Sequence, residues 1–455
     1  MRRTGVIALL AAATLALSCG ERSYRIAVTI DSSLPGDTVT LSGFDGRTFI
    51  PVDSLRIPAE VPRVIFSADS LLPAGLYVVS LNREDLFEII VSGPAGQRFS
   101  ARINPENGDG VRFEGSAENS QNAEFQRRIA AIRDRLPADG PSPETDAALT
   151  ELQQNTAAET RGSLLSSMIR AQMPVPVPLY LTGKEERERY RREHMWDRFD
   201  FSDERLIRTP LLYGQLRRFV QSFPERDEEA RTRAVCALLE RTTTDGVSGA
   251  MQRYIPATLF SLYDDRESPL ASDSMVLLTG TYLLANRLHD GLADSLRICF
   301  AMENARKNRI GHTAADFTLT DAQNRPVSLH RIEARYTLLY FFDPDCSVCQ
   351  QVTEAVEFLK RKYGPAGLQV VSVYTEFETD KWRTYLSSGR LRNCINLHAP
   401  SGGNDIRERY DLFGMPILYL LDERKRVVLK NIPPTDPVTP VFYHMNRIHE
   451  EKKSH

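Results

Sequence analysis

Cys346 and Cys349, which have two residues between them, are the side chains of this sequence best suited to chemistry. On a helix, residues three apart are neighbours, with Cβ atoms roughly 5–6 Å from each other. A disulfide needs Cα atoms about 4.4–6.8 Å apart, so this pair could open and close with little backbone movement. The free N–H groups of a helix N-terminus favour a thiolate, which makes Cys346 the expected nucleophile. Cys349, one turn deeper, would resolve the mixed disulfide.

A zinc site is the alternative use of such a pair. Zinc needs two further ligands, usually from a second close pair. The sequence holds no second Cys-x-x-Cys and no His-x-x-x-His. We therefore predict redox chemistry by the two thiols themselves, without a metal and without a bound cofactor.

The residues around the pair predict the elements that position it. Tyr336–Phe342 is an apolar run that predicts a buried strand, and Asp343-Pro344-Asp345 interrupts it. After the cysteines, Val352, Val356 and Leu359 lie on one side of a predicted helix. A strand, a tight loop and a helix would thus place the first cysteine at the start of the helix.

The last 146 residues resemble the thioredoxin superfamily, in particular its envelope-tethered branch of TlpA and ResA type. Besides the cysteine pair, the resemblance rests on the entry segment Ile310–Leu319 and on Phe413–Asp422, a strand preceded by Gly-x-Pro. It implies an α/β thioredoxin-like domain over residues 310–455 and thiol–disulfide oxidoreductase activity. It also implies that Pro416 is cis and that the backbone of Met415 pairs with an extended substrate segment.

This C-terminal region departs from the family at three positions. Asp345 stands where Trp is common, Met415 where Thr or Val is usual, and Tyr340 where thioredoxin has a buried acid. Asp343 and Asp345 place negative charge beside the first cysteine, which opposes the helix dipole and favours reducing or isomerising work over strong oxidation. Glu354 is either a substitute proton acceptor or a solvated helix residue.

The N-terminus predicts a lipoprotein signal segment over residues 1–19. Arg2-Arg3 is basic, Val6–Leu17 is apolar but too short to span a bilayer, and Ala16-Leu17-Ser18-Cys19 resembles a bacterial lipobox. Cleavage before Cys19 would leave that residue lipidated. We expect a cell-envelope protein anchored in the outer membrane and facing the periplasm; an ordinary secretory signal peptide is the alternative.

Three cysteines remain, Cys236, Cys299 and Cys394. Each sits among apolar residues, so buried, inert thiols are expected. In an oxidising compartment a disulfide between Cys236 and Cys299 is the alternative.

Residues 24–115 predict an all-β sandwich or barrel-like domain, with no catalytic constellation and a spacer or docking role. Short apolar runs alternate there with turn residues. The expected strands are Arg25–Val28, Thr38–Leu41, Val64–Phe66, Leu76–Val79, Phe87–Val91 and Arg98–Ala101.

Residues 116–309 change to the period of a helix and predict an all-α domain. The region resembles the helical domain of uncharacterised function that precedes thioredoxin-like domains in some envelope lipoproteins. His194, Asp197, Asp200 and Asp203 could be drawn as a metal site, but aromatic packing and helix capping explain the same residues.

The net charge and the distribution of basic residues argue against nucleic-acid binding. A chain of 455 residues with net charge −3 and no basic stripe gives no sign of nucleic-acid binding.

We predict an envelope-anchored oxidoreductase that exchanges disulfides with protein thiols and is served by a thiol-based electron donor. A non-catalytic scaffold built on the thioredoxin fold is the alternative. Copper handling is disfavoured, because the related copper chaperones use a wider cysteine spacing and a distal His.

Overall fold

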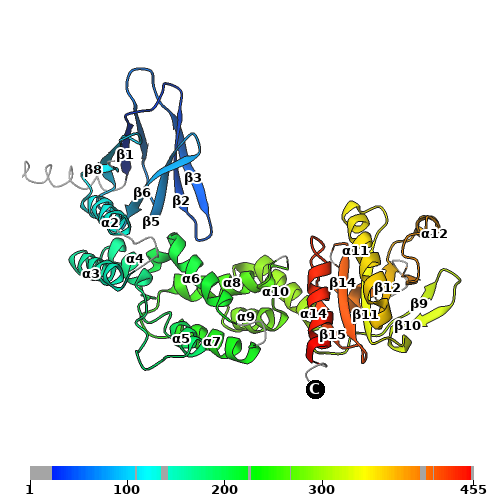
Figure 1. Cartoon of the computed structure of the whole chain (residues 1–455). Coiled ribbons are helices and arrows are strands. Elements are labelled where there is room, and N and C mark those ends of the chain that lie inside the picture. The colour runs from blue at the N-terminus through cyan, green and yellow to red at the C-terminus, as the bar shows by residue number, and fades with distance from the viewer. Residues whose placement is uncertain are drawn as a thin grey trace, which may run out of the picture. The chain divides into compact units, whose positions relative to one another are not determined.

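The computed structural model describes residues 23–451 apart from 108–109, 135–141, 224–226, 267, 400–405 and 413. Cys19 and the predicted signal segment lie outside the described residues. By its internal contacts the chain divides into two compact units, Met1–Leu259 and Phe260–His455. Figure 1 shows the elements of both and labels those for which there is room. Among the described residues, no helix is both long and apolar enough to cross a membrane.

The first unit begins with the predicted β domain, which consists of two four-stranded sheets. Their strand orders are β4-β1-β7-β8 and β3-β2-β5-β6. Side chains from both sheets, among them Ile26, Leu41 and Tyr77, form one buried apolar cluster, so the sheets are the halves of a sandwich. The strands are β1 (Tyr24–Ile30), β2 (Thr38–Phe44), β3 (Phe49–Arg56), β4 (Arg63–Ala68), β5 (Gly75–Leu81), β6 (Glu84–Val91), β7 (Arg98–Ile103) and β8 (Arg112–Glu114).

Sequence reasoning missed two of these strands, β3 and β8. No residue of β3 is fully buried and β8 has only three residues, so neither carries the apolar alternation by which a strand is recognised.

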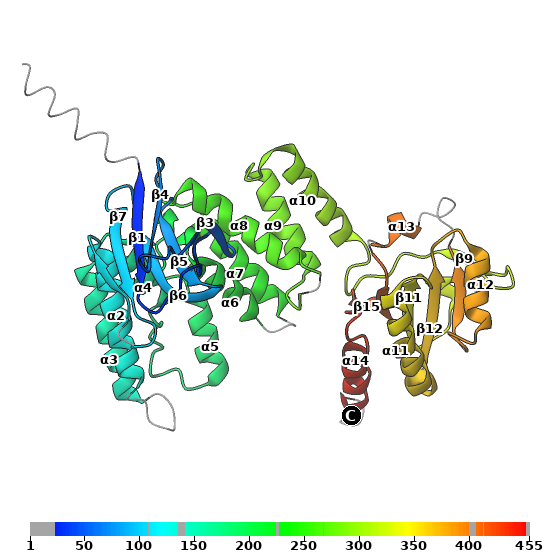
Figure 2. The ribbon, with the colours of Figure 1, turned by 90° about the horizontal axis from the view of Figure 1, so that it is seen from above.

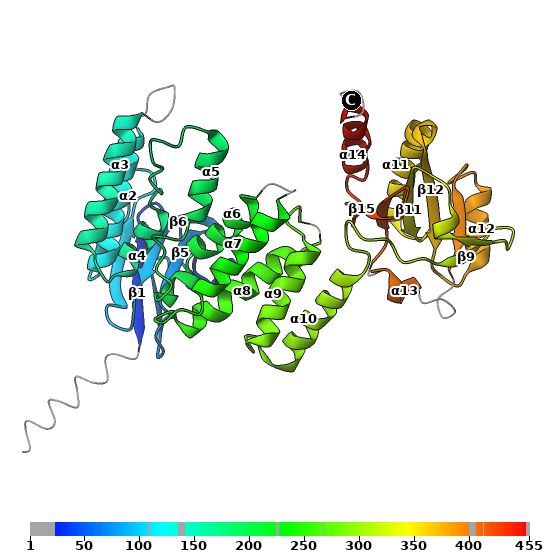
Figure 3. The same ribbon diagram turned by 90° about the horizontal axis from the view of Figure 1, so that it is seen from below.

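The helices that follow begin at polar caps. Ser116, Ser142 and Ser163 each accept a backbone N–H from the first turn of the helix they precede. Helices α2 and α3 run side by side (Figure 3). The helices of this region are α2 (Ala117–Arg133), α3 (Pro143–Glu159), α4 (Leu164–Gln172), α5 (Lys184–Glu193), α6 (Pro210–Gln221), α7 (Glu228–Arg241) and α8 (Gly249–Asp264), with the 3-10 helix η1 (Glu204–Arg208) before α6.

One buried amide joins the sandwich to the helices within this unit. Asn119 of α2 is 1% exposed. Its side chain accepts the backbone N–H of Ile90 at 2.7 Å and donates to the carbonyl of Ile90 at 2.9 Å. Ile90 lies on β6, an edge strand, so the amide satisfies backbone groups that no neighbouring strand could pair.

The second unit holds a seven-stranded sheet of order β10-β9-β13-β12-β11-β14-β15. Strand β11 lies inside it, parallel to β12 and antiparallel to β14, and all seven of its residues are buried. The strands are β9 (Thr318–Asp321), β10 (Pro326–Ser328), β11 (Tyr336–Phe342), β12 (Leu368–Tyr374), β13 (Ile395–His398), β14 (Ile417–Asp422) and β15 (Val427–Lys430). The helices are α9 (Asp273–Ala285), α10 (Gly291–Arg306), α11 (Ser347–Tyr363), α12 (Thr379–Ser387), α13 (Ile406–Arg409) and α14 (Val438–Glu451).

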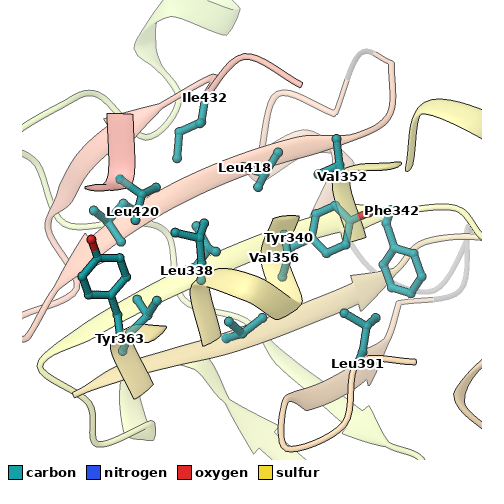
Figure 4. Packing of buried hydrophobic residues seen from close by; sticks show 14 of the residues in the cluster. Leu338, Tyr340, Phe342, Val352, Val356, Tyr363, Leu391, Leu418, Leu420 and Ile432 are labelled. Atoms are coloured by element: carbon teal, nitrogen blue, oxygen red, sulfur yellow. The ribbon is translucent and has the colours of Figure 1, made fainter. Parts of the chain in front are cut away.

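The alternation of β11 divides the core of this sheet into two layers. Leu338, Tyr340 and Phe342 pack against α11 on one face (Figure 4). Leu339 and Phe341 enter the cluster on the other face. Helix α14 shares the face of α11 (Figure 2), whereas α13 belongs to the opposite cluster. This is the predicted α/β thioredoxin-like architecture.

Within the same unit, a buried lysine joins the sheet to helices α9 and α10. Lys430 ends β15, and its side chain is 3% exposed. The ammonium group donates to Asp273 Oδ2 at 2.9 Å, to the Lys307 carbonyl at 2.8 Å and to the Asn304 carbonyl at 3.4 Å. All three donors of the ammonium group are therefore used, at the N-terminus of one helix and the C-terminus of the other.

We expect Lys430→Met to lower the free energy of unfolding by about 3 kcal/mol, because it removes a buried ammonium group and leaves the half-buried Asp273 carboxylate without its partner. Burial already raises the pKa of Asp273, and Lys430 opposes that rise. Denaturant titration measures the loss. Lys362→Met, at an exposed lysine, is the control, and adding Asp273→Asn to Lys430→Met should restore part of the stability. An unchanged midpoint in Lys430→Met would contradict this role.

Candidate active site

The loop between β11 and α11 places Cys346 at the first position of the helix. Strand β11 ends at Phe342, and Cys346 is the N-cap residue of α11. The Cys346 N–H donates to the Asp343 carbonyl at 3.1 Å, and the Gln350 side chain donates to the Pro344 carbonyl at 3.0 Å. The loop is therefore held at both ends, and the predicted strand-loop-helix arrangement is confirmed.

The sulfur of Cys346 lies between the helix terminus and the segment before β14. Cys346 is half-buried. Its Sγ accepts the backbone N–H of Cys349 at 3.4 Å and lies 3.7 Å from the Met415 carbonyl, to which it donates. The Met415–Pro416 peptide bond is cis, as predicted, and Pro416 directly precedes β14. The fold thus brings together the four residues that the sequence selected from two distant segments; their functional roles remain predictions.

Cys349 occupies a very different environment from Cys346. Its residue is 1% exposed, and it packs in the cluster between α11 and the sheet. Burial raises the pKa of the Cys349 thiol to about 12, and the neighbouring Cys346 adds to the rise. Cys349 is therefore a neutral thiol at physiological pH, and it must lose a proton before it can attack a disulfide.

Hydroxyl groups surround the first turn of α11 below the cysteines. Tyr340, at the position of the thioredoxin acid, donates to the Cys349 carbonyl at 2.8 Å and lies 3.0 Å from the Thr353 hydroxyl. The Tyr385 hydroxyl donates to Thr353 at 3.1 Å. Burial raises the pKa of Tyr340 far above its usual range, so this group stays protonated. Glu354 is exposed, in agreement with its reading as a solvated residue.

The acidic flank of Cys346 has a cationic partner that sequence reasoning missed. Lys381 of α12 places its Nζ 2.8 Å from Asp345 Oδ2 and also binds Glu378. The other acid, Asp343, accepts the backbone N–H of Asp345 at 3.0 Å. No pattern in the sequence indicates that Lys381 reaches a residue 36 positions earlier.

The residues of the helical region that could be drawn as a metal site are engaged in capping and ion pairs. Asp197 contacts His194 at 2.5 Å and Arg241 at 3.1 Å. Asp203 caps η1 and pairs with Arg205 at 2.7 Å. No group of three or more potential ligands gathers around a metal position in the described part of the chain. Capping and pairing therefore account for these residues.

The remaining cysteines differ from one another. Cys236, Cys299 and Cys394 are free thiols, so the alternative disulfide between the first two is absent. Burial raises the pKa of Cys394 to about 12, consistent with an inert thiol. The expectation that all three are buried is wrong: Cys236 and Cys394 are only half-buried, and Cys299 is exposed because its position falls on the open side of α10.

Comparison with protein families assigns two regions of the chain. Residues 310–430 match the AhpC/TSA family, and residues 145–308 match DUF5106, a domain of unknown function. No curated protein matches the chain.

Solved structures include several similar proteins. A thioredoxin-like protein from Bacteroides caccae is 25% identical, with a TM-score of 0.51, over 60% of this chain and 98% of its own. A conserved protein of unknown function from Bacteroides fragilis is 31% identical over 29% of this chain and 98% of its own, with a TM-score of 0.27. A domain of a possible thiol-disulfide isomerase from Cytophaga hutchinsonii is 24% identical over 33% of this chain and 99% of its own, with a TM-score of 0.30.

The family match and the sheet topology agree with the predicted resemblance. The C-terminal region of this chain is a thioredoxin-like domain of the AhpC/TSA family, and a DUF5106 domain of unknown function precedes it.

Proposed function

We propose that this protein is a thiol–disulfide oxidoreductase that exchanges disulfides with protein substrates through Cys346 and Cys349. The observation that carries the proposal is the unequal pair at the start of α11. One sulfur is half-buried at the helix N-terminus, 3.7 Å from the Met415 carbonyl, and the other residue is buried one turn deeper. This asymmetry suits a nucleophile and a resolving thiol.

The exchange takes place in two steps. The Cys346 thiolate attacks one sulfur of a substrate disulfide, so a mixed disulfide forms, the substrate S–S bond breaks and the departing thiolate takes a proton from water. Cys349 then loses its proton and attacks Cys346 Sγ, which releases the second substrate thiolate. The substrate gains two electrons and is reduced, and the pair is oxidised to a disulfide. A thiol-based donor must reduce the pair again.

We assign the net direction as reducing or isomerising. Negative charge beside a thiolate destabilises the reduced form of the pair relative to its disulfide. Asp343 supplies such charge in the loop that leads to Cys346, and Asp345 adds the part of its charge that its pairing with Lys381 leaves uncompensated. A pair of this kind gives electrons to a substrate more readily than it takes them.

Trapping the mixed disulfide tests the proposed activity. In Cys349→Ser the second step is blocked, so substrate proteins should stay linked to Cys346 and appear as reductant-sensitive adducts on non-reducing gels. Cys346→Ser with Cys349→Ser is the matched control and should trap none. Identical adducts in both variants would assign the linkage to Cys236, Cys299 or Cys394 and would contradict the proposal. No adducts in either would favour the scaffold.

Site-resolved alkylation tests the roles of the two thiols. At pH 8, far below the pKa of about 12 of Cys349, this thiol is almost entirely protonated. Mass spectrometry of the reduced protein should therefore find Cys346 alkylated first and Cys349 protected. Cys394, a half-buried thiol whose pKa is also about 12, is an internal control for a thiol with a raised pKa. Faster labelling of Cys349 would reverse the assigned roles.

We also propose that lipid on Cys19 anchors the protein in the outer membrane, facing the periplasm. The support is the sequence of residues 1–19 alone. Cys19→Ala should move the protein from the membrane fraction to the soluble envelope fraction or block removal of the signal segment, because the acyl chains supply the membrane affinity. Fractionation and the mass of the mature N-terminus measure both effects. Membrane partitioning that survives Cys19→Ala with normal cleavage would refute the anchor.

A further inference from the structure

Helix α12 carries a lysine to the loop that leads into the redox pair. Lys381 Nζ lies 2.8 Å from Asp345 Oδ2, and Asp345 is the residue before Cys346. Lys381 also binds Glu378, the N-cap residue of its own helix. These bonds raise the pKa of Lys381, so it stays a cation throughout the range in which thiols titrate.

The position of Lys381 is held by the residue beside it. Trp382 is 1% exposed and stacks on Tyr374 at 6.4 Å between ring centroids, with 6° between the ring planes. It also stacks on His398 at 5.4 Å, and Tyr374 and His398 lie 5.5 Å apart. Tyr374 ends β12 and His398 ends β13, so α12 is anchored to the sheet through a buried aromatic stack. The backbone at Lys381 is therefore fixed beside the loop, and only the lysine side chain is ordered when it pairs.

Charged residues of the loop and of α12 both act on the side chain of Tyr374. Burial raises the pKa of Tyr374 to about 12; Asp343, Glu378 and Glu376 raise it further, whereas Lys381 lowers it. The ammonium group of Lys381 itself pairs with two carboxylates, those of Asp345 and Glu378. With Lys381 removed, the charge of Asp345 would act on the neighbouring thiolate without compensation.

We propose that Lys381 is a positioning residue of the redox site, which offsets the charge of Asp345 and so maintains the thiolate of Cys346. The other groups that face Cys346 are Asp343 in its loop, Cys349 in its helix and Tyr340 from β11. The proposal rests on Cys346 being the nucleophile of the proposed function. It assigns α12 an electrostatic task that the family match does not describe.

The test compares Lys381→Met with Arg383→Met in the full-length reduced protein. Both changes remove one positive charge from an exposed position on α12. Of the two side chains, only Lys381 forms an ion pair with another of the described residues. We expect Lys381→Met to slow alkylation of Cys346 at pH 7 about two- to fivefold and to lower the ultraviolet absorbance of its thiolate. The difference should shrink at high salt, since the pair is exposed. Lys381→Arg should restore the rate.

Asp345→Asn decides whether the effect passes through the named carboxylate. In an Asp345→Asn background, adding Lys381→Met should change the alkylation rate no more than Arg383→Met does. An unchanged rate in Lys381→Met, or a loss that persists in the Asp345→Asn background, would overturn the proposal. Alkylation needs no protein substrate, so this result is separate from the trapping experiment: adducts with an unchanged rate would leave the proposed function standing without a role for Lys381.

Discussion

The site depends on the placement of the α11 N-terminus at the end of a fully buried strand. Strand β11 pairs on both sides and contributes side chains to both layers of the core, so its end at Phe342 cannot shift without disturbing the whole sheet. The loop to Cys346 is short and hydrogen-bonded at both ends. The first N–H groups of α11 therefore meet the sulfur of Cys346 in a fixed geometry, and a thiolate there receives the partial positive charge of the helix terminus.

The two cysteines differ because the helix enters the core within one turn. Cys346 remains half-buried at the surface, whereas Cys349 is covered by the sheet and is neutral at physiological pH. Around the first turn the fold supplies the hydroxyls of Tyr340, Thr353 and Tyr385. The ionised groups lie on the outer side of the pair, on the loop and on α12, where water screens them. The electrostatics of the pair are therefore adjusted from the surface, and the interior holds it in position.

Within the second unit, helices α9 and α10 are held on the sheet through buried polar groups. The Lys430 ammonium group donates three hydrogen bonds, to Asp273 at the start of α9 and to the carbonyls of Asn304 and Lys307 at the end of α10. Asp411, 3% exposed and five residues before Pro416, pairs with Arg266 at 2.5 Å. Burying ions is favourable only when every partner is in place, so these contacts specify one arrangement of the two helices on the sheet. Because of these contacts, α9 and α10 belong to the same compact unit as the C-terminal sheet.

The sequence by itself determined the elements whose signal is local. The buried strand at Tyr336–Phe342, the helix that begins at the cysteines, the helical period after residue 116 and the proline before β14 were all recognisable from their own residues. Strands β3 and β8 were missed because exposure or shortness removes the apolar alternation. Cys299 was taken for a buried thiol because its neighbours are apolar, although it lies on an exposed side of α10.

Only the tertiary structure decided which distant residues meet. Cys346 and Met415 were linked in advance by the resemblance alone, and their contact exists because β11 and β14 are neighbours in the sheet. The pairing of Lys381 with Asp345 had no signal in the sequence. Charged residues on exposed faces are common, and their partners depend on how α12 is anchored by Trp382. The pKa of Cys349 likewise follows from burial, which no local pattern measures. Local periodicity identifies an element, but charge pairing and desolvation depend on what the rest of the chain places around it.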